Sequence, residues 1–150
     1  MKWTGNEGSG TSGYTSYTRD HVITSGLKRP IEGSSDPAFR GDVKRWNPEE
    51  LLVASISACH KLWYLHLCSA SGVTVLNYTD VAEGVMEENE TGGGHFVHVI
   101  LRPHVTICTG EDRDTALRLH RDAHSKCFIA NSVNFPVTHD PVVHWENEVR

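Results

Sequence analysis

The chain has 150 residues, of which 38% are hydrophobic and 22% are charged, and its mean hydropathy is -0.38. These values are typical of a soluble globular protein of about one domain, so we expect a single domain over residues 1–150 and exclude a disordered chain. The formal net charge is -5, and the Lys and Arg residues are scattered along the sequence. Without a basic stripe, nucleic acid is excluded as an expected partner.

The N-terminal segment is expected to form strands and turns. MKWTGNEGSGTSG contains no apolar run after Lys2, as a secretory signal would need, and this predicts a cytoplasmic protein. We expect a short strand over residues 2–4 and a longer one over residues 14–25, which are rich in Thr, Tyr, Val and Ile. The Pro- and Gly-containing stretch 27–46 predicts an irregular loop.

The strongest helix signal begins at Asn47 and Pro48. An Asn side chain can cap free backbone amides, and Pro fits the first helical position, where no amide partner is lost. Two glutamates follow, at positions where the helix dipole favours carboxylates. The helix is expected to run to about residue 71 and to end at Gly72.

This helix is apolar on nearly every side. Residues 51–68 contain His60, Lys61 and His66, so we interpret them as a buried core helix and expect no membrane partner. One domain of this size rarely encloses a helix completely. The pattern therefore predicts either a sheet wrapped around the helix or a second subunit covering it, and we favour a homodimer.

The C-terminal half predicts two arms of a hairpin, a second helix and a final strand. The β-rich runs 73–86 and 95–107 flank the turn segment ENETGGG, which favours antiparallel pairing. Residues 111–126 have the periodicity of a surface helix, and residues 135–145 that of a strand at a sheet edge. The order β, β, α, β, β, α, β lacks regular βαβ alternation and predicts an α+β fold with antiparallel pairing.

Four cysteines could carry chemistry: Cys59, Cys68, Cys108 and Cys127. They form no CxxC pair, which excludes a zinc-knuckle or thioredoxin motif, and a reducing cytosol disfavours a structural disulfide. Cys68 follows Cys59 by nine helical positions and so faces the opposite side of the helix. We interpret Cys68 and Cys108 as structural, and the other two as either structural thiols or a catalytic pair.

The segments RWNPEELLVASISACH and AHSKCFIANSV together resemble the two signature regions of the OsmC/Ohr superfamily, the osmotically inducible and organic hydroperoxide resistance proteins. In that family a peroxidatic Cys follows the first Glu of an NPEEL-like start by ten residues, and a second Cys lies in a later AxxxC segment. Glu49, Cys59 and Cys127 fall on these positions. The resemblance implies an α+β OsmC-like fold, with antiparallel sheets wrapped around a long central helix in an intertwined homodimer.

The resemblance also implies a stress-response peroxidase. Cys59 would attack an organic hydroperoxide and become a sulfenic acid, which Cys127 would condense with to form a disulfide. No bound cofactor or metal is expected, and an external dithiol, often a lipoyl-bearing protein in relatives, would reduce the disulfide. In the family an arginine held by the Glu lowers the thiol pKa. We assign that role to Arg40, and a solvated surface role to Arg19 and Arg45.

The natural hydroperoxide is left open, because His60, Lys61 and Phe128 stand where many relatives carry other residues. Some apolar residues could line a site for an alkyl chain, although each one singly is more typical of ordinary core: Phe39, Leu62, Trp63 and Phe128.

Two alternatives to a peroxidase remain at this stage. One is a metal site, since the chain has ten histidines and two helices that meet could bring four ligands together: Cys59, His60, His124 and Cys127. The other is a non-catalytic stress or binding protein on the same fold, because a fold does not fix a function.

Overall fold

The computed structural model describes residues 1–148, and the chain forms two compact units, Met1–Leu52 and Val53–Arg150. The expectation of one domain over residues 1–150 stays a prediction. In the first unit, three short strands form an antiparallel sheet in the order β1-β2-β3. They are β1 (Lys2–Trp3), β2 (His21–Ile23) and β3 (Ile31–Gly33), and a 3-10 turn, η1 (Pro37–Phe39), follows.

The expected strand over residues 14–25 is wrong for most of its length. Only residues 21–23 pair in the sheet, because the preceding residues turn around the Arg19 side chain. Its guanidinium lies over the Tyr14 and Tyr17 rings, 4.4 and 4.3 Å from their centroids, and donates to both backbone carbonyls. The stretch expected as an irregular loop contains β3, an element whose three residues were too few to give a pattern.

The helix α1 (Pro48–Ala70) forms where the sequence predicts it. The Asn47 side chain accepts from the Glu50 amide at 2.7 Å, and the Glu50 carboxylate accepts from the Asn47 amide at 3.1 Å. This reciprocal capping box satisfies two amides that the helix leaves free. Gly72, with φ 72°, takes the left-handed conformation that ends the helix.

Replacing Asn47 by alanine is expected to lower the free energy of unfolding by about 1 kcal/mol, because the Glu50 amide loses its acceptor. Urea unfolding followed by circular dichroism measures this. Asn47→Asp is the matched control, since aspartate caps as well as asparagine, and an equal loss in both variants would contradict the capping argument.

In the second unit, the expected hairpin is present but divided in the middle of each arm. The strands are β4 (Val75–Asp80), β5 (Glu83–Glu88), β6 (Gly94–Leu101) and β7 (Pro103–Ile107). β4 pairs with β7 and β5 pairs with β6, both antiparallel, so that the two halves of the hairpin belong to separate sheets. The expected glycine-rich turn lies between β5 and β6.

The expected last strand is also divided, and its pairing differs from the prediction. Pro141 separates β8 (Val137–His139) from β9 (Val142–Trp145), because Pro cannot donate to a ladder. β8 pairs with β6, and β9 with β7, both in parallel. The predicted antiparallel pairing holds for β4 with β7 and for β5 with β6, whereas β8 and β9 add parallel pairs at the edges of the two sheets. The α+β class is confirmed.

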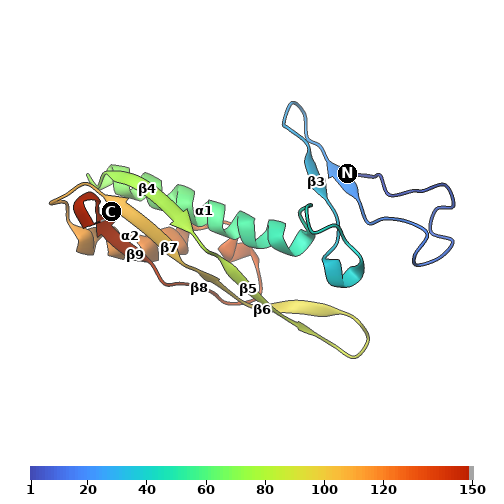
Figure 1. Ribbon diagram of the computed structural model, residues 1–150. Coiled ribbons are helices and arrows are strands. Elements are labelled where there is room, and N and C mark those ends of the chain that lie inside the picture. Colours follow the sequence, from blue (N-terminus) through green and yellow to red (C-terminus); the bar gives the residue numbers. More distant parts are fainter. Residues whose placement is uncertain (149–150) are drawn as a thin grey trace. The chain divides into compact units, whose positions relative to one another are not determined.

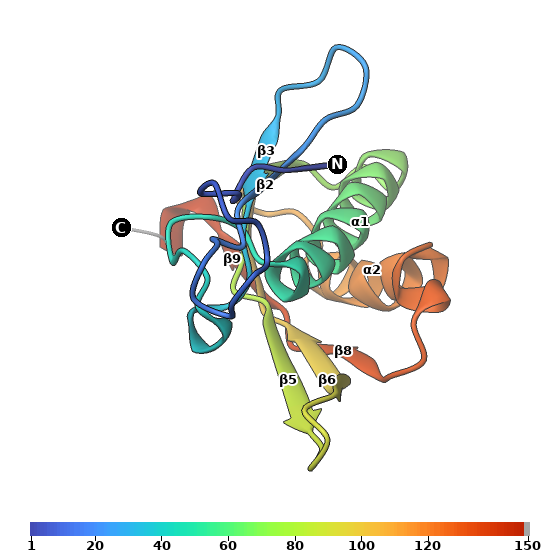
Figure 2. The same cartoon turned by 90° about the vertical axis from the view of Figure 1, so that its right-hand side faces the viewer.

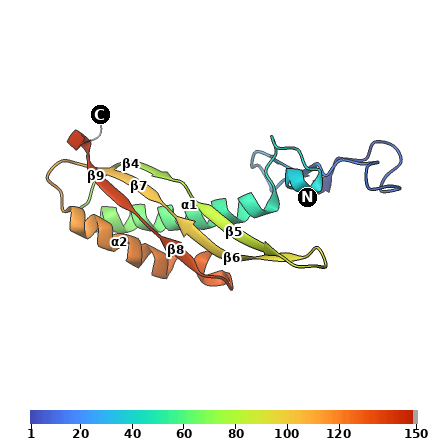
Figure 3. The same cartoon turned by 60° about the horizontal axis from the view of Figure 1, so that its bottom comes forward.

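The second helix, α2 (Arg113–Lys126), is capped by Asp112, and short 3-10 turns follow at η2 (Ala130–Ser132) and η3 (Glu146–Glu148). Within the second unit, α1 and α2 run side by side on one face of the strands (Figures 1 and 3). The quarter-turned view again places both helices on the same side of the strands (Figure 2). The core between the layers draws its buried residues from both helices, from the segment after α1 and from β7 and β9: Tyr64, Cys68, Val73, Val105, Ile107, Ala116, Leu119, Ala123 and Val143.

Only one stripe of α1 is buried, formed by Ile56, His60, Tyr64 and Cys68 at successive turns. Apolar residues elsewhere on the helix are partly or largely exposed, as Leu62 is with 63% of its surface exposed. The sheets of the second unit therefore do not enclose the helix. Among residues 1–148, α1 is the one helix whose length and composition would suffice to cross a bilayer. The histidine in its buried stripe is more typical of a core helix.

Candidate active site

Cys59 and Cys127 meet where α1 packs against the end of α2. Cys59 lies on α1 and is partly exposed, whereas Cys127 follows the last residue of α2 and is fully buried. The Cys59 thiol lies close enough to Cys127 to raise the pKa of the buried thiol. The Cys127 Sγ also accepts from the Ala130 amide at 3.4 Å and lies 4.0 Å from the Ile56 carbonyl oxygen. The fold thus brings together the two cysteines that the sequence singles out.

The surroundings of Cys127 keep its thiol protonated. Burial is the main cause that raises the pKa of Cys127 to about 11; the Ala130 amide acts in the opposite direction, and the neighbouring Cys59 thiol acts in the same direction as burial. A thiolate is the nucleophilic form of cysteine, so Cys127 is unreactive at neutral pH until its surroundings change. Of the two sulfurs, only the partly exposed Cys59 can meet a substrate directly.

The other two cysteines lie elsewhere. Cys68 is buried in the core beside Tyr64, and burial raises the pKa of its thiol. Cys108 follows β7 and is partly exposed. All four cysteines are free thiols. These positions agree with the structural role expected for Cys68 and Cys108.

Glu49 and Arg40 both belong to the first unit. The carboxylate that caps α1 belongs to Glu50, so Glu49 has no part in the cap. Glu49 forms no ion pair within residues 1–52. Arg40 ends the η1 turn in the left-handed conformation, with φ 66°, and its side chain is exposed. The unit therefore does not pair these two residues with each other.

The surface role expected for Arg19 and Arg45 is wrong, because both side chains are partly buried and engaged. Arg45 lies within 3.6 to 3.7 Å of three carboxylates, those of Asp20, Glu32 and Asp42. The Arg19 guanidinium is held between two tyrosine rings. Of the three candidate arginines, Arg40 is the exposed one, whereas Arg19 and Arg45 are partly buried and engaged within the first unit.

A cluster of histidines lies in the second unit, and of its members only His60 and His124 were singled out from the sequence, as possible metal ligands. His60 on α1 and His120 on α2 are fully buried, and the His60 Nε2 and His120 Nδ1 atoms lie 3.0 Å apart in a hydrogen bond. His120 stacks on Tyr64 with the ring centroids 3.8 Å apart. His139 lies 5.5 Å from His60 and 5.5 Å from His124, measured between ring centroids.

Three of these imidazoles, those of His60, His120 and His139, are held in the neutral form. Burial, together with repulsion from His139 and His124, lowers the pKa of His60 to about 4, and burial together with repulsion from His60 and His139 lowers the pKa of His120 to about 3. Burial also lowers the pKa of His139. Three nitrogens of the cluster have no hydrogen-bond partner among the described residues: His60 Nδ1, His120 Nε2 and His124 Nδ1.

The metal site considered from the sequence is not formed. His60 points to His120, and within residues 1–148 no three His, Cys, Asp or Glu side chains are placed to hold a metal ion. The two thiols and the imidazole pair are therefore separate features of the same interface between α1 and α2.

Exposed apolar side chains flank the thiol pair. Leu62 and Phe128 are 63% and 71% exposed, and Trp63, one turn after Cys59, meets Phe128 edge-on with ring centroids 5.9 Å apart. Leu62, Trp63 and His66 line a shallow pocket of 280 Å³. An ordinary core role is wrong for Leu62 and Phe128, and also for Phe39, which is 48% exposed in the first unit.

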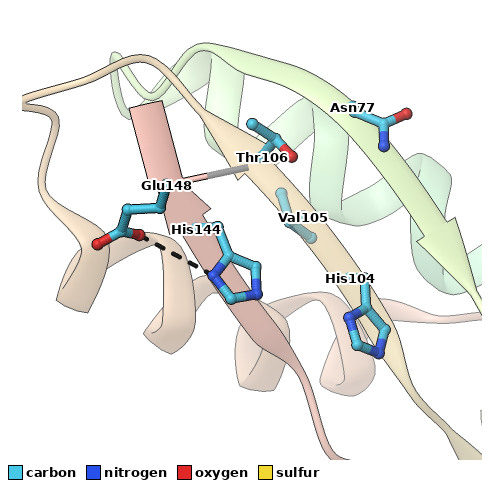
Figure 4. A pocket seen from close by; sticks show the side chains of 6 residues that line it. All are labelled: Asn77, His104, Val105, Thr106, His144 and Glu148. Carbon is cyan, nitrogen blue, oxygen red and sulfur yellow. Dashed lines mark ion pairs between the residues drawn. The ribbon is translucent and has the colours of Figure 1, made fainter. Parts of the chain in front are cut away.

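A second hollow, of 330 Å³, lies on the outer face of the β4-β7-β9 sheet (Figure 4). His104 and Thr106 point outward because Val105 and Ile107, which alternate with them, are buried toward the helices. Glu148 at its rim is paired with Arg113 and lies 3.9 Å from His144. This hollow is on the opposite side of the sheet from the thiol pair and contains no cysteine.

The comparisons with known proteins agree with this arrangement. The model of the OsmC-like protein family matches residues 41–141, a range that includes Glu49, Cys59 and Cys127 but begins one residue after Arg40. A solved OsmC-like protein of unknown function from Vibrio cholerae is 30% identical, with 84% of this chain and 86% of that chain covered and a TM-score of 0.77. No curated protein sequence matches the chain.

Two further solved structures share the fold at lower identity. An organic hydroperoxide resistance protein from Elizabethkingia anophelis is 19% identical, with 85% of this chain and 96% of that chain covered and a TM-score of 0.58. The corresponding protein OhrB of Bacillus subtilis is 18% identical, with 83% and 97% covered and a TM-score of 0.51. The fold and the thiol pair define an α+β protein of the OsmC/Ohr type. The chain belongs to the OsmC-like protein family.

Proposed function

We propose that this protein is a thiol-dependent peroxidase that reduces organic hydroperoxides to alcohols in a stress response. The observation that carries the proposal is the contact between a partly exposed thiol, Cys59, and a buried thiol, Cys127. Such a pair can take up two electrons from a dithiol and pass them to a peroxide without a cofactor. Two solved relatives in fold are named organic hydroperoxide resistance proteins, which supports the substrate class.

The chemistry follows from the different exposure of the two sulfurs. The Cys59 thiolate attacks the distal oxygen of ROOH, the O–O bond breaks, and the alkoxide takes up a proton to leave as ROH. Cys59 is then a sulfenic acid. The Cys127 sulfur attacks it, an S–S bond forms, and water leaves with the Cys127 proton. The proximity of Cys59 to Cys127 supports this step.

An external dithiol completes the cycle. It attacks the Cys59–Cys127 disulfide, becomes oxidised to its own disulfide, and returns both protein thiols. A lipoyl-type dithiol is our proposal for this reductant, and no resident cofactor is needed for the cycle. The protein would act in the cytoplasm, where such dithiols are kept reduced.

We expect the active form to be a homodimer. The buried stripe of α1 packs inside its own chain, and several other apolar side chains of that helix are exposed or only partly buried, Leu62 among them. A second copy would bury them, as predicted for a helix that is apolar on nearly every side. Leu62, Trp63 and Phe128, which lie beside the thiol pair, would then line a site for the alkyl part of a hydroperoxide.

Arg40 is proposed to supply the positive charge that stabilises the Cys59 thiolate. Glu49 is proposed to hold that guanidinium in the active homodimer, since the two residues form no ion pair within the first unit of one chain. Arg40→Gly is a sharp test, because glycine suits the left-handed conformation at this position and should not destabilise the fold. We expect the rate of Cys59 oxidation by cumene hydroperoxide to fall by about tenfold or more, as the charge that favours the thiolate is lost.

Arg40→Lys is the matched control, since it keeps the charge and the backbone strain, and it should retain more activity than Arg40→Gly. Stopped-flow fluorescence of reduced protein measures both rates. A wild-type oxidation rate in Arg40→Gly would show that Arg40 does not stabilise the thiolate, and Arg19 would then be the next candidate.

The proposed function is tested by peroxide consumption with purified reduced protein and dithiothreitol. Cumene hydroperoxide should be consumed in many turnovers, and faster than hydrogen peroxide, because the side chains around Cys59 are apolar. Turnover of neither peroxide would contradict the proposal and leave a binding function on the same fold.

A further inference from the structure

The side chains buried where α1 packs against α2 are mostly apolar or aromatic. They include Ile56 and Tyr64 on α1 and Ala116 and Ala123 on α2, all fully buried. Among the described residues of the two helices, one side-chain hydrogen bond joins α1 to α2, the 3.0 Å contact between the imidazoles of His60 and His120. Apolar contacts have no directional preference, whereas a hydrogen bond needs a fixed distance and direction.

The imidazole pair belongs to the same surface as the two thiols. On α1, His60 follows Cys59 directly and lies one turn after Ile56, whose carbonyl oxygen is 4.0 Å from the Cys127 sulfur. On α2, His120 precedes Cys127 by about two turns and so lies on the same face of the helix. A shift of α2 along α1 by one residue, about 1.5 Å, would therefore displace both contacts together.

The pair is also an unfavourable arrangement for stability alone. Each ring keeps one nitrogen without a partner among the described residues, and burial of such a group costs free energy that an apolar pair would not. A buried polar contact of this kind is best attested as a device that fixes the register of two helices.

We propose that His60 and His120 are positioning residues that fix the register of α1 against α2, and so hold Cys127 where it can close the disulfide with Cys59. The inference rests on the proposed function, since it concerns the resolving step of that cycle. Neither imidazole touches the reacting sulfurs. Without the pair, several registers of an apolar interface become close in energy, and the thiols are apposed for a smaller fraction of the time.

Closure of the disulfide can be measured without any hydroperoxide. One equivalent of 2,2'-dithiodipyridine reacts with Cys59 and releases one thiopyridone. Cys127 then displaces the second thiopyridone as it forms the Cys59–Cys127 disulfide. The second release, followed by absorbance, gives the closure rate directly. A Cys108→Ser background removes the other partly exposed thiol.

Three variants separate positioning from stability. His60→Gln retains an amide that can bond to His120, whereas His60→Met has a similar volume and cannot. His60→Leu with His120→Leu removes both polar groups and should be at least as stable as the parent protein. We expect closure to be about fivefold or more slower in the Met variant and in the double variant, and within about twofold of the parent in the Gln variant. Circular dichroism at the assay temperature confirms that each variant is folded.

Parent-like closure in a folded double variant would overturn the inference. If the double variant does not fold, equal closure rates in the Gln and Met variants would overturn it. Failure of the proposed function is a different outcome: the parent protein itself would then release only the first thiopyridone, because its two thiols do not close.

Discussion

Replacing Cys59 by serine is expected to reduce organic hydroperoxide turnover to the level of the buffer, a loss of at least about 10³-fold. A serine hydroxyl does not reduce a peroxide and has no counterpart of the sulfenic acid, so neither step of the cycle can take place. Serine is close to cysteine in volume, and Cys59 is only partly buried, so the fold should be retained. Consumption of cumene hydroperoxide in the presence of dithiothreitol is the measurement.

Cys127→Ser should fail at a different step. The buried thiol does not meet the peroxide, so Cys59 is still oxidised once, but its sulfenic acid persists and can be trapped by dimedone. Cys108→Ser is the control and should turn over at the parent rate. If the Cys59→Ser protein still consumes the peroxide, the assignment of Cys59 as the peroxidatic cysteine is contradicted.

Acid should destabilise the protein through its buried histidines. In the unfolded chain a histidine takes up a proton near pH 6.5, whereas in the folded protein His60 and His120 do so only near pH 4 and pH 3. Between these limits the unfolded state binds more protons, so the free energy of unfolding falls as the pH is lowered. The contribution is fully present above pH 6.5.

The expected slope is up to about 1.4 kcal/mol per pH unit for each histidine, so the pair alone can remove several kcal/mol by pH 4.5. Neighbouring histidines also oppose protonation of the pair: His139 and His124 act on His60, and His60 and His139 act on His120. Urea unfolding at a series of pH values measures the slope. The double variant His60→Leu with His120→Leu should lose most of it, and an unchanged slope in that variant would contradict the assignment.

Much of the fold is predictable from local patterns. The cap at Asn47, the stop at Gly72 and the glycine-rich turn after β5 are each set by residues within a few positions, and they lie where the sequence predicts them. The split of the hairpin into two sheets and the parallel pairing of β8 and β9 depend on which strands meet in space. The sequence around these strands contains no such information beyond Pro141.

The candidate site also combines features that local sequence predicts with features that depend on contacts between distant residues. The motif around Glu49 and Cys59 and the AxxxC segment of Cys127 are local signals, and the contact between the two thiols agrees with them. The pairing of His60 with His120 joins residues 60 positions apart, and single histidines on an apolar face gave no reason to connect them. The engagement of Arg45 by three carboxylates likewise depends on packing within the first unit.

The most direct test of the peroxidase mechanism is a single turnover of reduced protein with one equivalent of cumene hydroperoxide, without a reductant. The protein mass and its peptide map would be read together with the cumyl alcohol formed. The mechanism predicts one alcohol per chain, a loss of two hydrogens from the protein and a peptide joined through Cys59 and Cys127. Alcohol without that disulfide, or a disulfide that involves Cys68 or Cys108 instead, would contradict it.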